Sequence, residues 1–494
     1  MISLVHHNDL AISQPYEGLS IIDAIYKCAL KNPDEYLIIH KQDVDVKAFK
    51  EMLPELSHKA YFFSNYNHTN EDLGYVEDSP FINVNKKVKY PTWMKGTSIV
   101  CIHSKLVNST VNSHSSFKNY LYWLNSIGKM SQTLGVLNYQ IPTVLQNQHL
   151  NTAQLYKFVK QHYKTRWVFI LLFCHLWYEK RFPFLAFIKS FYHSANYLKL
   201  DVDSLQKPNT KKVNGSLSYD VVIPTMGRTN YLKDVLLDLN NQNILPESVI
   251  IIEQNAGIEA TSDLYFIREK HWDFKIIHEF TLITGACRAR NRALALSTAE
   301  WVLLFDDDVR VEKKFSSQVS DFLNKRHVES VSFSCLQEGE TEKSHNFLQW
   351  PAFGSGCSIV HQNVIKKCQF DMALEHGYGE DVDYGMQIRN AGYDVIYAPQ
   401  IQLLHLKAPV GGFRKPHIFP WQDDDIQPKP SPQIMYHRRK NYTQKQFRGY
   451  KLTLFIKFYK DYSIKNPISY YNYFKKAWSN SLYWSQKFEE DAKV

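Results

Sequence analysis

The segment that decides the fold is AEWVLLFDDDVRV, residues 299–311. Its apolar run WVLLF predicts a buried strand, yet three mutually repelling aspartates follow that strand directly. In an extended chain Asp306 and Asp308 point to one side and Asp307 to the other. Two converging carboxylates suit a hard divalent cation, Mg²⁺ or Mn²⁺. The simpler alternative is that acidic residues merely cap a loop.

Regular alternation of strands and helices surrounds this segment. Strands are predicted at 219–224, 247–252, 273–280 and 300–305, with helices at 230–242 and 287–297 between them. Strand, helix and strand in repeated order predict a mostly parallel, doubly wound α/β sheet with helices on both faces. Ligands bind beyond the carboxyl ends of such strands, which is where the three aspartates lie.

A second acidic pair lies in GYGEDVDYGMQIRNAG, residues 377–392. The second part of this stretch predicts a helix that ends at Gly392. Glu380 and Asp381 would then stand at the helix start, where the positive helix end can keep a carboxylate ionised. Such a carboxylate is a suitable general base. The alternative is that both residues are simple helix caps.

One more strand is expected before LLHLKAPVGGFR, residues 403–414. His405 near its end is a candidate metal ligand, although a single histidine is more often structural. Arg414, in the flexible GGFR loop, is a candidate anion-binding residue.

Taken in this order, the segments resemble the family 2 glycosyltransferases of the GT-A fold over about residues 219–414. The motifs that carry the resemblance are VVIPTMGR, GACRARNRAL, FDDDV and GED, followed by the histidine at position 405. The resemblance implies a Rossmann-like domain that moves a sugar from a nucleotide-diphospho-sugar to an acceptor hydroxyl by single displacement with inversion. It also implies Mn²⁺ or Mg²⁺ as the cofactor.

The resemblance also implies roles for individual residues. The donor-binding residues would be Pro224, Thr225, Arg228, Glu253, Arg290, Asn291, Asp306, Asp307 and Arg414. The metal ligands would be Asp306, Asp308 and His405, and Asp381 would be the catalytic base with Glu380 beside it.

Two stretches depart from the family pattern. IIEQNAG places Glu253 and Gln254 where the family often has Asp-Asp-Gly-Ser, so the nucleotide base is not identified. GSGCSIVHQNVI resembles the acceptor-side strand and loop but has Gln362 where Arg is usual. The donor sugar, the acceptor and the linkage stay open.

The rest of the chain predicts further parts around a catalytic domain at 219–430. Residues 1–200 predict another α/β domain, for which a degenerate GT-A-like unit is one hypothesis, with strands within 32–41, 95–107 and 135–145 and aromatic-rich helices after 155. Residues 201–218 predict a linker, and residues 431–494 a helical extension. In DVDVKAFKEML, Asp43 is predicted to cap a helix rather than to join Asp45 in a second metal site.

Charge is concentrated in one segment of a chain whose net charge is +9. Residues 431–476 hold eleven Lys and Arg, one acid and twelve Phe and Tyr. This composition is compatible with a packed helical extension that leaves its lysines in water, or with an interfacial helix on an anionic membrane. Binding to nucleic acid is disfavoured, because one basic segment on an otherwise neutral protein makes no phosphate-tracking surface.

Composition indicates a folded protein of two or three domains, 44% hydrophobic and 22% charged. The apolar run at 167–178 is too short to span a bilayer, and no secretory signal is evident at the first residues. Seven cysteines without a Cys-x-x-Cys pair predict neither disulfides nor a zinc site, which favours a cytoplasmic setting, including the inner face of the membrane.

The function predicted from these features is inverting, metal-dependent glycosyl transfer in bacterial surface glycan synthesis, with a glycan or lipid-linked glycan as acceptor. The alternative is a GT-A-like scaffold or carbohydrate-binding protein without turnover. A phosphoryl-transfer enzyme is disfavoured because the sequence has no Walker motif.

Overall fold

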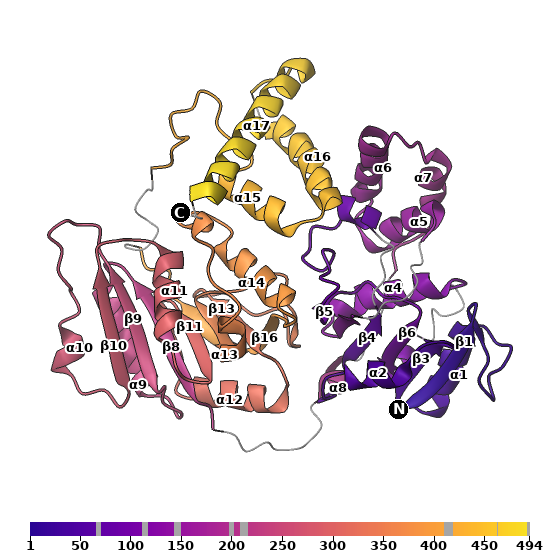
Figure 1. Cartoon of the computed structure of the whole chain (residues 1–494), viewed down its shortest axis with the longest axis horizontal. Helices are drawn as coiled ribbons and strands as arrows, with labels where there is room; N and C mark the ends of the chain where they lie inside the picture. The colour runs from indigo at the N-terminus through magenta and orange to yellow at the C-terminus, as the bar shows by residue number, and fades with distance from the viewer. Residues whose placement is uncertain are drawn as a thin grey trace. The chain divides into compact units, whose positions relative to one another are not determined.

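The chain divides into two compact units, which are described separately here (Figure 1). The N-terminal unit comprises Met1–Asn209 and Tyr442–Lys465, and the C-terminal unit comprises Thr210–Asn441 and Asn466–Val494. The structure is a computed structural model that describes residues 1–65, 71–110, 117–142, 150–196, 202–207, 216–409, 418–461 and 463–491. In these residues no helix is long and apolar enough to cross a membrane.

A mixed sheet of nine strands forms the centre of the C-terminal unit, in the order β10-β9-β8-β11-β15-β13-β16-β12, with β14 paired to β16. The strands are β8 (Tyr219–Thr225), β9 (Ser248–Gln254), β10 (Lys275–Thr281), β11 (Trp301–Phe305), β12 (Val309–Arg310), β13 (Ser330–Leu336), β14 (Leu348–Gln349), β15 (Cys357–His361) and β16 (Ile396–His405). The first four in spatial order are parallel, and β13 is parallel to β16. The predicted strands are therefore confirmed.

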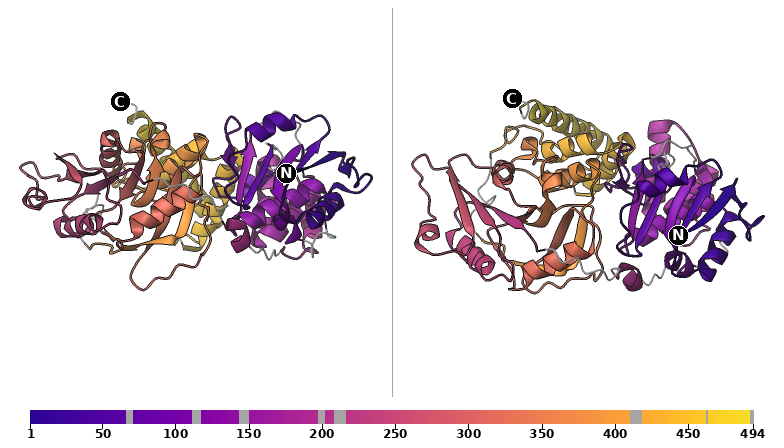
Figure 2. Two further views of the ribbon diagram at one scale, coloured as in Figure 1. Left: turned by 90° about the horizontal axis from the view of Figure 1, so that it is seen from below. Right: turned by 60° about the horizontal axis from the view of Figure 1, so that its bottom comes forward.

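Helices cover both faces of this sheet (Figure 2). The main ones are α9 (Thr229–Asn240), α11 (Ala286–Leu296), α12 (Phe315–Lys325), α13 (Gln362–Ile365) and α14 (Glu380–Asn390), with α10 (Phe266–Glu269) at the edge. Helices α11 and α14 share one apolar core with Val222 and Leu304. On the other face Phe315 of α12 packs against Phe305 of β11, with ring centroids 6.0 Å apart. The expected doubly wound α/β architecture is confirmed.

The N-terminal unit is built on a second sheet of seven strands, ordered β2-β1-β3-β6-β4-β7-β5. The strands are β1 (Ile2–His7), β2 (Leu10–Ala11), β3 (Tyr36–Lys41), β4 (Tyr61–Asn65), β5 (Tyr90–Pro91), β6 (Ile99–His103) and β7 (Leu137–Ile141). Its helices are α1 (Ile21–Lys31), α2 (Val46–Glu51), α3 (Ser104–Asn108), α4 (Tyr120–Gln132), α5 (Thr152–His162), α6 (Arg166–Glu179), α7 (Phe184–Ser190) and α8 (Val202–Gln206), with the 3₁₀ helix η1 (Glu71–Tyr75). The predicted second α/β domain is present.

The two sheets share one topology. Along the path β1-β3-β6-β4-β7-β5 the successive pairs are parallel, antiparallel, antiparallel, parallel and antiparallel. The path β8-β11-β15-β13-β16-β14 has the same directions in the same order. Within each path the matched strands also follow one another identically along the chain. The N-terminal sheet is therefore a second copy of the C-terminal arrangement.

Side chains confirm the register of this match. Tyr36 lies opposite His103 across β3 and β6, and Trp301 lies opposite His361 across β11 and β15. Both ring pairs are T-shaped, with centroids 4.8 and 4.9 Å apart. Each histidine ring also accepts a hydrogen bond from the second backbone N–H of the helix that follows it. The equivalence therefore holds residue by residue.

A pair of glycines supports the match between the two units. In each unit the pair lies around the end of the helix before the matched strand, α4 before β7 and α14 before β16. Gly128 and Gly135 stand seven residues apart around the end of α4, and Gly385 and Gly392 do so around the end of α14. Gly135 and Gly392 both have positive φ, 101° and 92°, where a residue with a side chain is strained. Helices α1 and α11 are each eleven residues long. Four residues separate α1 from β3, and four separate α11 from β11.

The N-terminal copy lacks one part of the sheet. Between β8 and α11 the C-terminal unit inserts α9, β9, α10 and β10, whereas only residues 8–20, with the short strand β2, separate β1 from α1. The missing strands are those that carry Glu253 and its neighbours in the C-terminal unit. A nucleotide could not be held in the N-terminal unit by the same elements.

Two expectations about chain organisation need correction. The residue that caps α2 is Asp45, whose carboxylate accepts a hydrogen bond from the Ala48 N–H at 3.0 Å, so Asp43 is not the cap. The expected linker at 201–218 contains the short helix α8, and Leu205 of that helix is buried in the N-terminal core. Residues 208–215 of that segment lie outside the described residues.

The predicted C-terminal helices are confirmed but belong to both units. Helices α15 (Pro432–Asn441) and α17 (Pro467–Asp491) are in the C-terminal unit, and α16 (Gln444–Asp461) is in the N-terminal unit. Several of their aromatic side chains are buried, among them Tyr436, Tyr470 and Phe474. The helical extension therefore packs on the two units and is not a separate domain.

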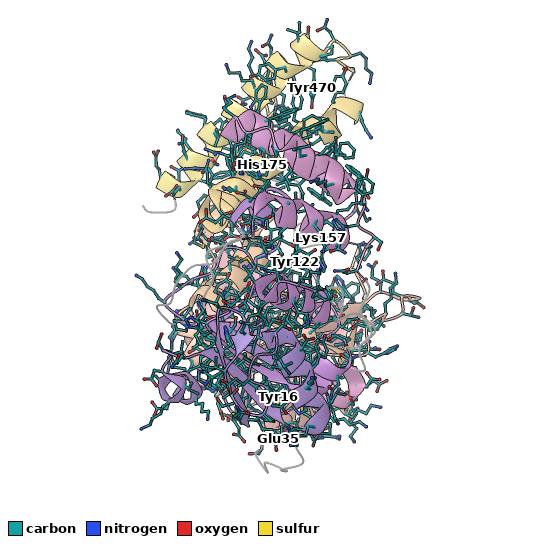
Figure 3. All side chains as sticks on the ribbon, turned by 90° about the vertical axis from the view of Figure 1, so that its right-hand side faces the viewer. Tyr16, Glu35, Tyr122, Lys157, His175 and Tyr470 are labelled. Atoms are coloured by element: carbon teal, nitrogen blue, oxygen red, sulfur yellow. The ribbon has the colours of Figure 1, made fainter. Side chains whose placement is uncertain are left out.

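Helix α16 is fixed to η1 and α6 by charge and by close packing. Lys445 pairs with Asp72 and lies 3.2 Å from a carboxylate oxygen of Glu179. Asp72 and Glu179 come close to His175 of α6, which Figure 3 labels, in an arrangement that could hold a metal ion. Arg181, 3.0 Å from Asp72, supplies a second positive charge, so these acids are already compensated and the cluster is an ion-pair network.

Gly449 lies where α16 touches η1, and a Cβ atom there would clash with the backbone carbonyl of Tyr75. Gly449→Ala is therefore expected to loosen α16 by about 1–3 kcal/mol, the usual cost of overpacking. Hydrogen exchange of the α16 amides should accelerate accordingly. Lys457→Ala, at an exposed position of the same helix, is the control and should leave exchange unchanged. Equal protection in both variants would contradict the assigned packing.

Candidate active site

Three ligand-type side chains converge at the end of β11. Asp306 and Asp308 follow the strand, and His405 is the last residue of β16. One ligand atom from each lies within 4.8 Å of the others, so the three can meet at one point. His405 is opposite Val309 in the pairing of β16 with β12, which brings it beside the aspartates. Residues 306–308 lie in the turn between β11 and β12, so this turn, and not the strand alternation assumed from the sequence, brings the three side chains together.

Asp307 is not part of this cluster and is almost fully buried. Its carboxylate accepts hydrogen bonds from the Thr225 hydroxyl and from Arg228, both at 2.7 Å. Burial raises the pKa of Asp307 to about 6, against the opposing effect of Arg228. The residue thus holds the turn after β8 against the end of β11.

Asp308 is stabilised as a carboxylate by its neighbours. Burial acts to raise its pKa, but hydrogen bonds from His405 and the Ala408 N–H and the charge of Arg228 outweigh burial and lower the pKa. The Asp308 carboxylate is 3.4 Å from His405 and 3.3 Å from Arg228. The hydrogen bond with Asp308 raises the pKa of His405 in return.

This donor set fits a divalent cation. Two carboxylates and one imidazole from two adjacent strand ends are ligands that Mn²⁺ accepts, and carboxylates with water suit Mg²⁺. Asp306 is partly exposed, so the site is open to solvent on one side. The Asp306 carboxylate has room beside residue 356 only because that residue is a glycine. A Cβ atom there would collide with the carboxylate.

Arg290 of α11 faces the same acids from the side. Its guanidinium donates to Asp306 at 3.2 Å and lies over the Phe370 ring at 5.5 Å. The residue is 6% exposed, and its Nε and Nη1 atoms are buried without a hydrogen-bond partner. Two unsatisfied N–H groups on a buried cation suit an anionic ligand such as a phosphate.

Glu380 and Asp381 begin α14, as the sequence predicts. Burial and the charge of Asp381 raise the pKa of Glu380 to about 7. Burial also raises the pKa of Asp381, Arg290 and Ser355 oppose that effect, and the charge of Asp306 adds to it. The Oδ1 atom of Asp381 is buried without a hydrogen-bond partner. The pair thus combines raised basicity with a free acceptor close to Arg290 and Asp306.

Helix α14 is held in place by contacts that the sequence did not reveal. Asp383, fully buried on this helix, accepts hydrogen bonds from Asn441 at 2.6 Å and from Lys440 at 2.9 Å. Lys440 also bonds to Asp371 at 2.6 Å. The acid in EDVD is visible in the sequence, but its partners on α15 lie more than fifty residues away, and no local pattern connects them.

Two predicted donor-binding residues already have protein partners. The side-chain amide of Asn291 binds both backbone groups of Phe370, at 2.8 Å each, so it positions the segment before α14. Glu253 accepts hydrogen bonds from His278 at 2.8 Å and from the Asp263 N–H at 2.9 Å. Neither is in the acid cluster.

Pro224 lies on β8 beside Thr225, and Arg414 lies outside the described residues.

A cavity of about 240 Å³ opens beside the ends of β9 and β10. Gln254, Glu279 and Thr281 line it from the strands, and Arg288 and Arg292 line it from α11. Arg292 is paired with Glu279 at 2.6 Å. Helix α11 therefore contributes to this hollow as well as to the acid cluster.

The equivalent positions of the N-terminal unit have lost this chemistry. By the strand register, Lys41 replaces Asp306, Gln42 replaces Asp307, and only Asp43 matches the acid at 308. The helix equivalences place Ile25 at the position of Arg290, and Trp123 and Leu124 at the positions of Glu380 and Asp381. Ile25, Trp123 and Leu124 are fully buried in the apolar core.

We therefore expect Asp43→Asn combined with Asp45→Asn to leave donor turnover within a few-fold of the parent. Asparagine caps helices as well as aspartate, so α2 should stay folded. Donor hydrolysis with Mn²⁺ is the measurement, and Asp308→Asn is the inactive control. If the double variant loses turnover while its circular dichroism is unchanged, the N-terminal unit holds a second site.

Comparison with known proteins finds a family match within the C-terminal unit. The profile of Glycosyl transferase family 2 matches residues 220–364, so this part of the chain is similar to a family 2 glycosyltransferase domain. A search of curated protein sequences finds no match to the chain.

Solved structures with similar folds include glycosyltransferases. S. aureus TarS in complex with UDP-GlcNAc is 16% identical with a TM-score of 0.35, over 51% of this chain and 75% of that one. A mannosyltransferase from Pyrobaculum calidifontis, in complex with GDP-Man and Mn²⁺, is 15% identical with a TM-score of 0.33, over 57% and 87%. Against another TarS structure, the chain spans 37% of that protein's length, at 18% identity and a TM-score of 0.32 over 39% of this chain.

Proposed function

We propose that the family 2 domain of this chain is an inverting, metal-dependent transferase that moves a sugar from a nucleotide-diphospho-sugar to an acceptor hydroxyl. The observation that carries the proposal is the cluster of Asp306, Asp308 and His405 beside a buried arginine with unsatisfied N–H groups. A divalent cation and a diphosphate together satisfy both features. Pro224 and Thr225, at the end of β8, and Arg228, at the start of α9, are the residues proposed to border the donor.

Asp306, Asp308 and His405 would hold Mn²⁺ or Mg²⁺, which neutralises negative charge on the departing diphosphate when bound. Arg290 binds a diphosphate oxygen through its free N–H groups and adds charge at the same place. Arg414 is proposed as a further phosphate ligand from the sequence.

Asp381 accepts the proton of the acceptor hydroxyl, and the hydroxyl oxygen attacks the anomeric carbon from the face opposite the diphosphate. The new glycosidic C–O bond forms as the bond to the diphosphate oxygen breaks, which inverts the anomeric centre. The buried, unpaired Oδ1 atom of Asp381 and its raised pKa fit a general base. Glu380, with a pKa raised to about 7, is the second candidate.

The alternative function is a scaffold or carbohydrate-binding protein without turnover. The N-terminal unit is the contrasting case, since its matched positions carry three apolar residues, Lys41 and Gln42, and only Asp43 keeps an acid. The C-terminal unit keeps its acids although they are partly buried and repel one another, which costs stability unless a ligand compensates. The retention of these acids in spite of their cost in stability favours an enzyme.

The cellular role proposed is synthesis of a bacterial surface glycan at the cytoplasmic face of the membrane, on a glycan or lipid-linked acceptor. Residues 431–476 support this through a surplus of ten positive charges, which attracts anionic lipid. Exposed lysines at 457, 460, 475 and 476 leave part of this charge in solvent.

Two isosteric variants test the proposal by separating the metal site from the base. Asp308→Asn removes a ligand charge, so Mn²⁺-dependent donor binding should weaken by more than about tenfold, which is what losing even an outer-shell partner can cost. Asp381→Asn should bind donor normally while transfer falls by roughly 10² to 10⁴. Calorimetric titration with donor and Mn²⁺ measures the first effect, and sugar transfer measures the second.

Normal transfer by Asp381→Asn would show that Asp381 is not the base, and Glu380→Gln would then be the variant to measure. Absence of donor hydrolysis by the parent protein across nucleotide sugars with Mn²⁺ would favour the binding protein.

The pH dependence of transfer provides a separate test of the base. Transfer should rise with pH as Asp381 deprotonates, at a pH above the usual carboxyl range because its pKa is raised. Arg290 lowers that pKa, so Arg290→Met should move the rising limb to higher pH in addition to slowing transfer. Arg292→Met, two residues along the same helix in an exposed ion pair, should not move the limb. A limb that shifts equally in both variants would exclude Asp381 as the titrating group.

A further inference from the structure

Helices α6 and α7 of the N-terminal unit expose an apolar surface, here called the apolar ridge. Its residues are Phe173 and Trp177 on α6, Phe182 in the connection, and Phe184, Leu185 and Ile188 on α7. Each is between 41% and 73% exposed in the structure. The two helices run side by side with a short connection between them, as Figure 1 shows.

The ridge is unusual because α6 is apolar on both faces. Val168, Leu171 and Cys174 are buried in the core of the unit, as expected for the inner face. The outer face should then be polar, but Phe169, Phe173 and Trp177, spaced by four residues, form an exposed stripe along it. At fourteen residues α6 is too short to span a bilayer.

Aromatic contacts hold the ridge in one conformation. The rings of Phe182 and Phe184 stack at 5.5 Å between centroids. Phe187 meets Phe169 at 5.2 Å and Phe191 at 5.1 Å in T-shaped pairs. A preformed apolar surface loses little side-chain entropy when it is covered, so it is well suited to binding.

Charge identifies the partner. Residues 150–196 contain seven Lys and Arg and a single acid, Glu179, which is paired with Arg181. Arg166, Lys180 and Lys189 are exposed around the ridge. Helix α16, which packs on α6, adds further exposed lysines to the same unit. Aromatic and aliphatic side chains flanked on their own helices mainly by positive charge fit the headgroup region of an anionic bilayer.

We propose that the apolar ridge is a membrane-interface surface, which inserts its exposed side chains into the headgroup region of an anionic bilayer while the flanking Lys and Arg bind lipid phosphates. The inference does not depend on glycosyl transfer. It assigns the apolar part of membrane binding to α6 and α7, in addition to the electrostatic attraction of residues 431–476.

The experiment uses the full-length protein and vesicles of phosphatidylcholine and phosphatidylglycerol in equal amounts, with pure phosphatidylcholine as the neutral arm. The parent should co-sediment with the anionic vesicles and much less with the neutral ones. The variant Trp177→Ser/Phe182→Ser/Leu185→Ser should lower the partition coefficient at least about tenfold, because burial of even one large apolar side chain is worth that factor.

The matched control is Leu10→Ser/Leu30→Ser/Met52→Ser, three exposed apolar residues of the same unit away from α6 and α7. It should bind vesicles like the parent. Donor hydrolysis without vesicles and circular dichroism check that each variant is folded, so loss of lipid binding is distinguished from loss of the proposed enzymatic activity. Should the triple variant misfold, Phe182→Ser alone, in the connection, must still lower the partition.

Three results would overturn the proposal. The ridge variant could bind anionic vesicles as tightly as the parent, or the control variant could lose binding to the same extent. Light scattering could also show that the parent is a dimer and the ridge variant a monomer, with neither binding vesicles. The ridge would then be an interface between two copies of the chain.

Discussion

The buried pairing of Asp307 with Arg228 is the interaction on which the active-site architecture depends. Three consecutive carboxylates at a strand end would repel one another, and this pairing turns the middle one inward, where Thr225 and Arg228 share its charge. The same arginine lies 3.3 Å from Asp308, so it also stabilises the neighbouring acid. Asp306 and Asp308 are left next to His405 as candidate metal ligands. The candidate cation site thus depends on how the charge of Asp307 is buried in the turn between β11 and β12.

The fold was predictable wherever a local pattern is sufficient. Apolar runs gave the strands, and the start of α14 at Glu380 followed from a glycine-rich turn before an amphipathic stretch. Where two residues of one type compete, the pattern was not sufficient, since Asp43 and Asp45 both precede α2 and only backbone geometry selects Asp45. Contacts distant in sequence were not predictable at all. Lys440 and Asn441 of α15 donate hydrogen bonds to Asp383 of α14. The composition of the segment that contains α15 suggested only a basic surface.

The repeated sheet explains which residues of a site can be lost without loss of the fold. Gly135 and the T-shaped pair of Tyr36 with His103 persist in the N-terminal unit, because they satisfy backbone and packing requirements. Of the matched acids and Arg290, only the acid at position 308 has a counterpart of the same type, Asp43. A buried arginine or carboxylate without a ligand is destabilising, and its replacement by Ile25, Trp123 or Leu124 adds apolar burial instead. In the C-terminal unit Arg290 and Asp381 remain buried with unsatisfied atoms, and that cost is tolerable where a ligand satisfies them.

Basic and aromatic composition has different meanings in two parts of this chain, and exposure is what separates them. In residues 431–476, Tyr436, Tyr470 and Phe474 are buried, so these rings stabilise the two units, although Tyr471 and Ile468 are exposed together with the lysines. In α6 and α7 the relation is reversed, since Trp177 and Leu185 are 62% and 73% exposed while the core beneath them is complete without them. Both segments combine a surplus of positive charge with many aromatic rings. A sequence records how many rings a helix carries, whereas the side on which they lie depends on packing partners elsewhere in the chain.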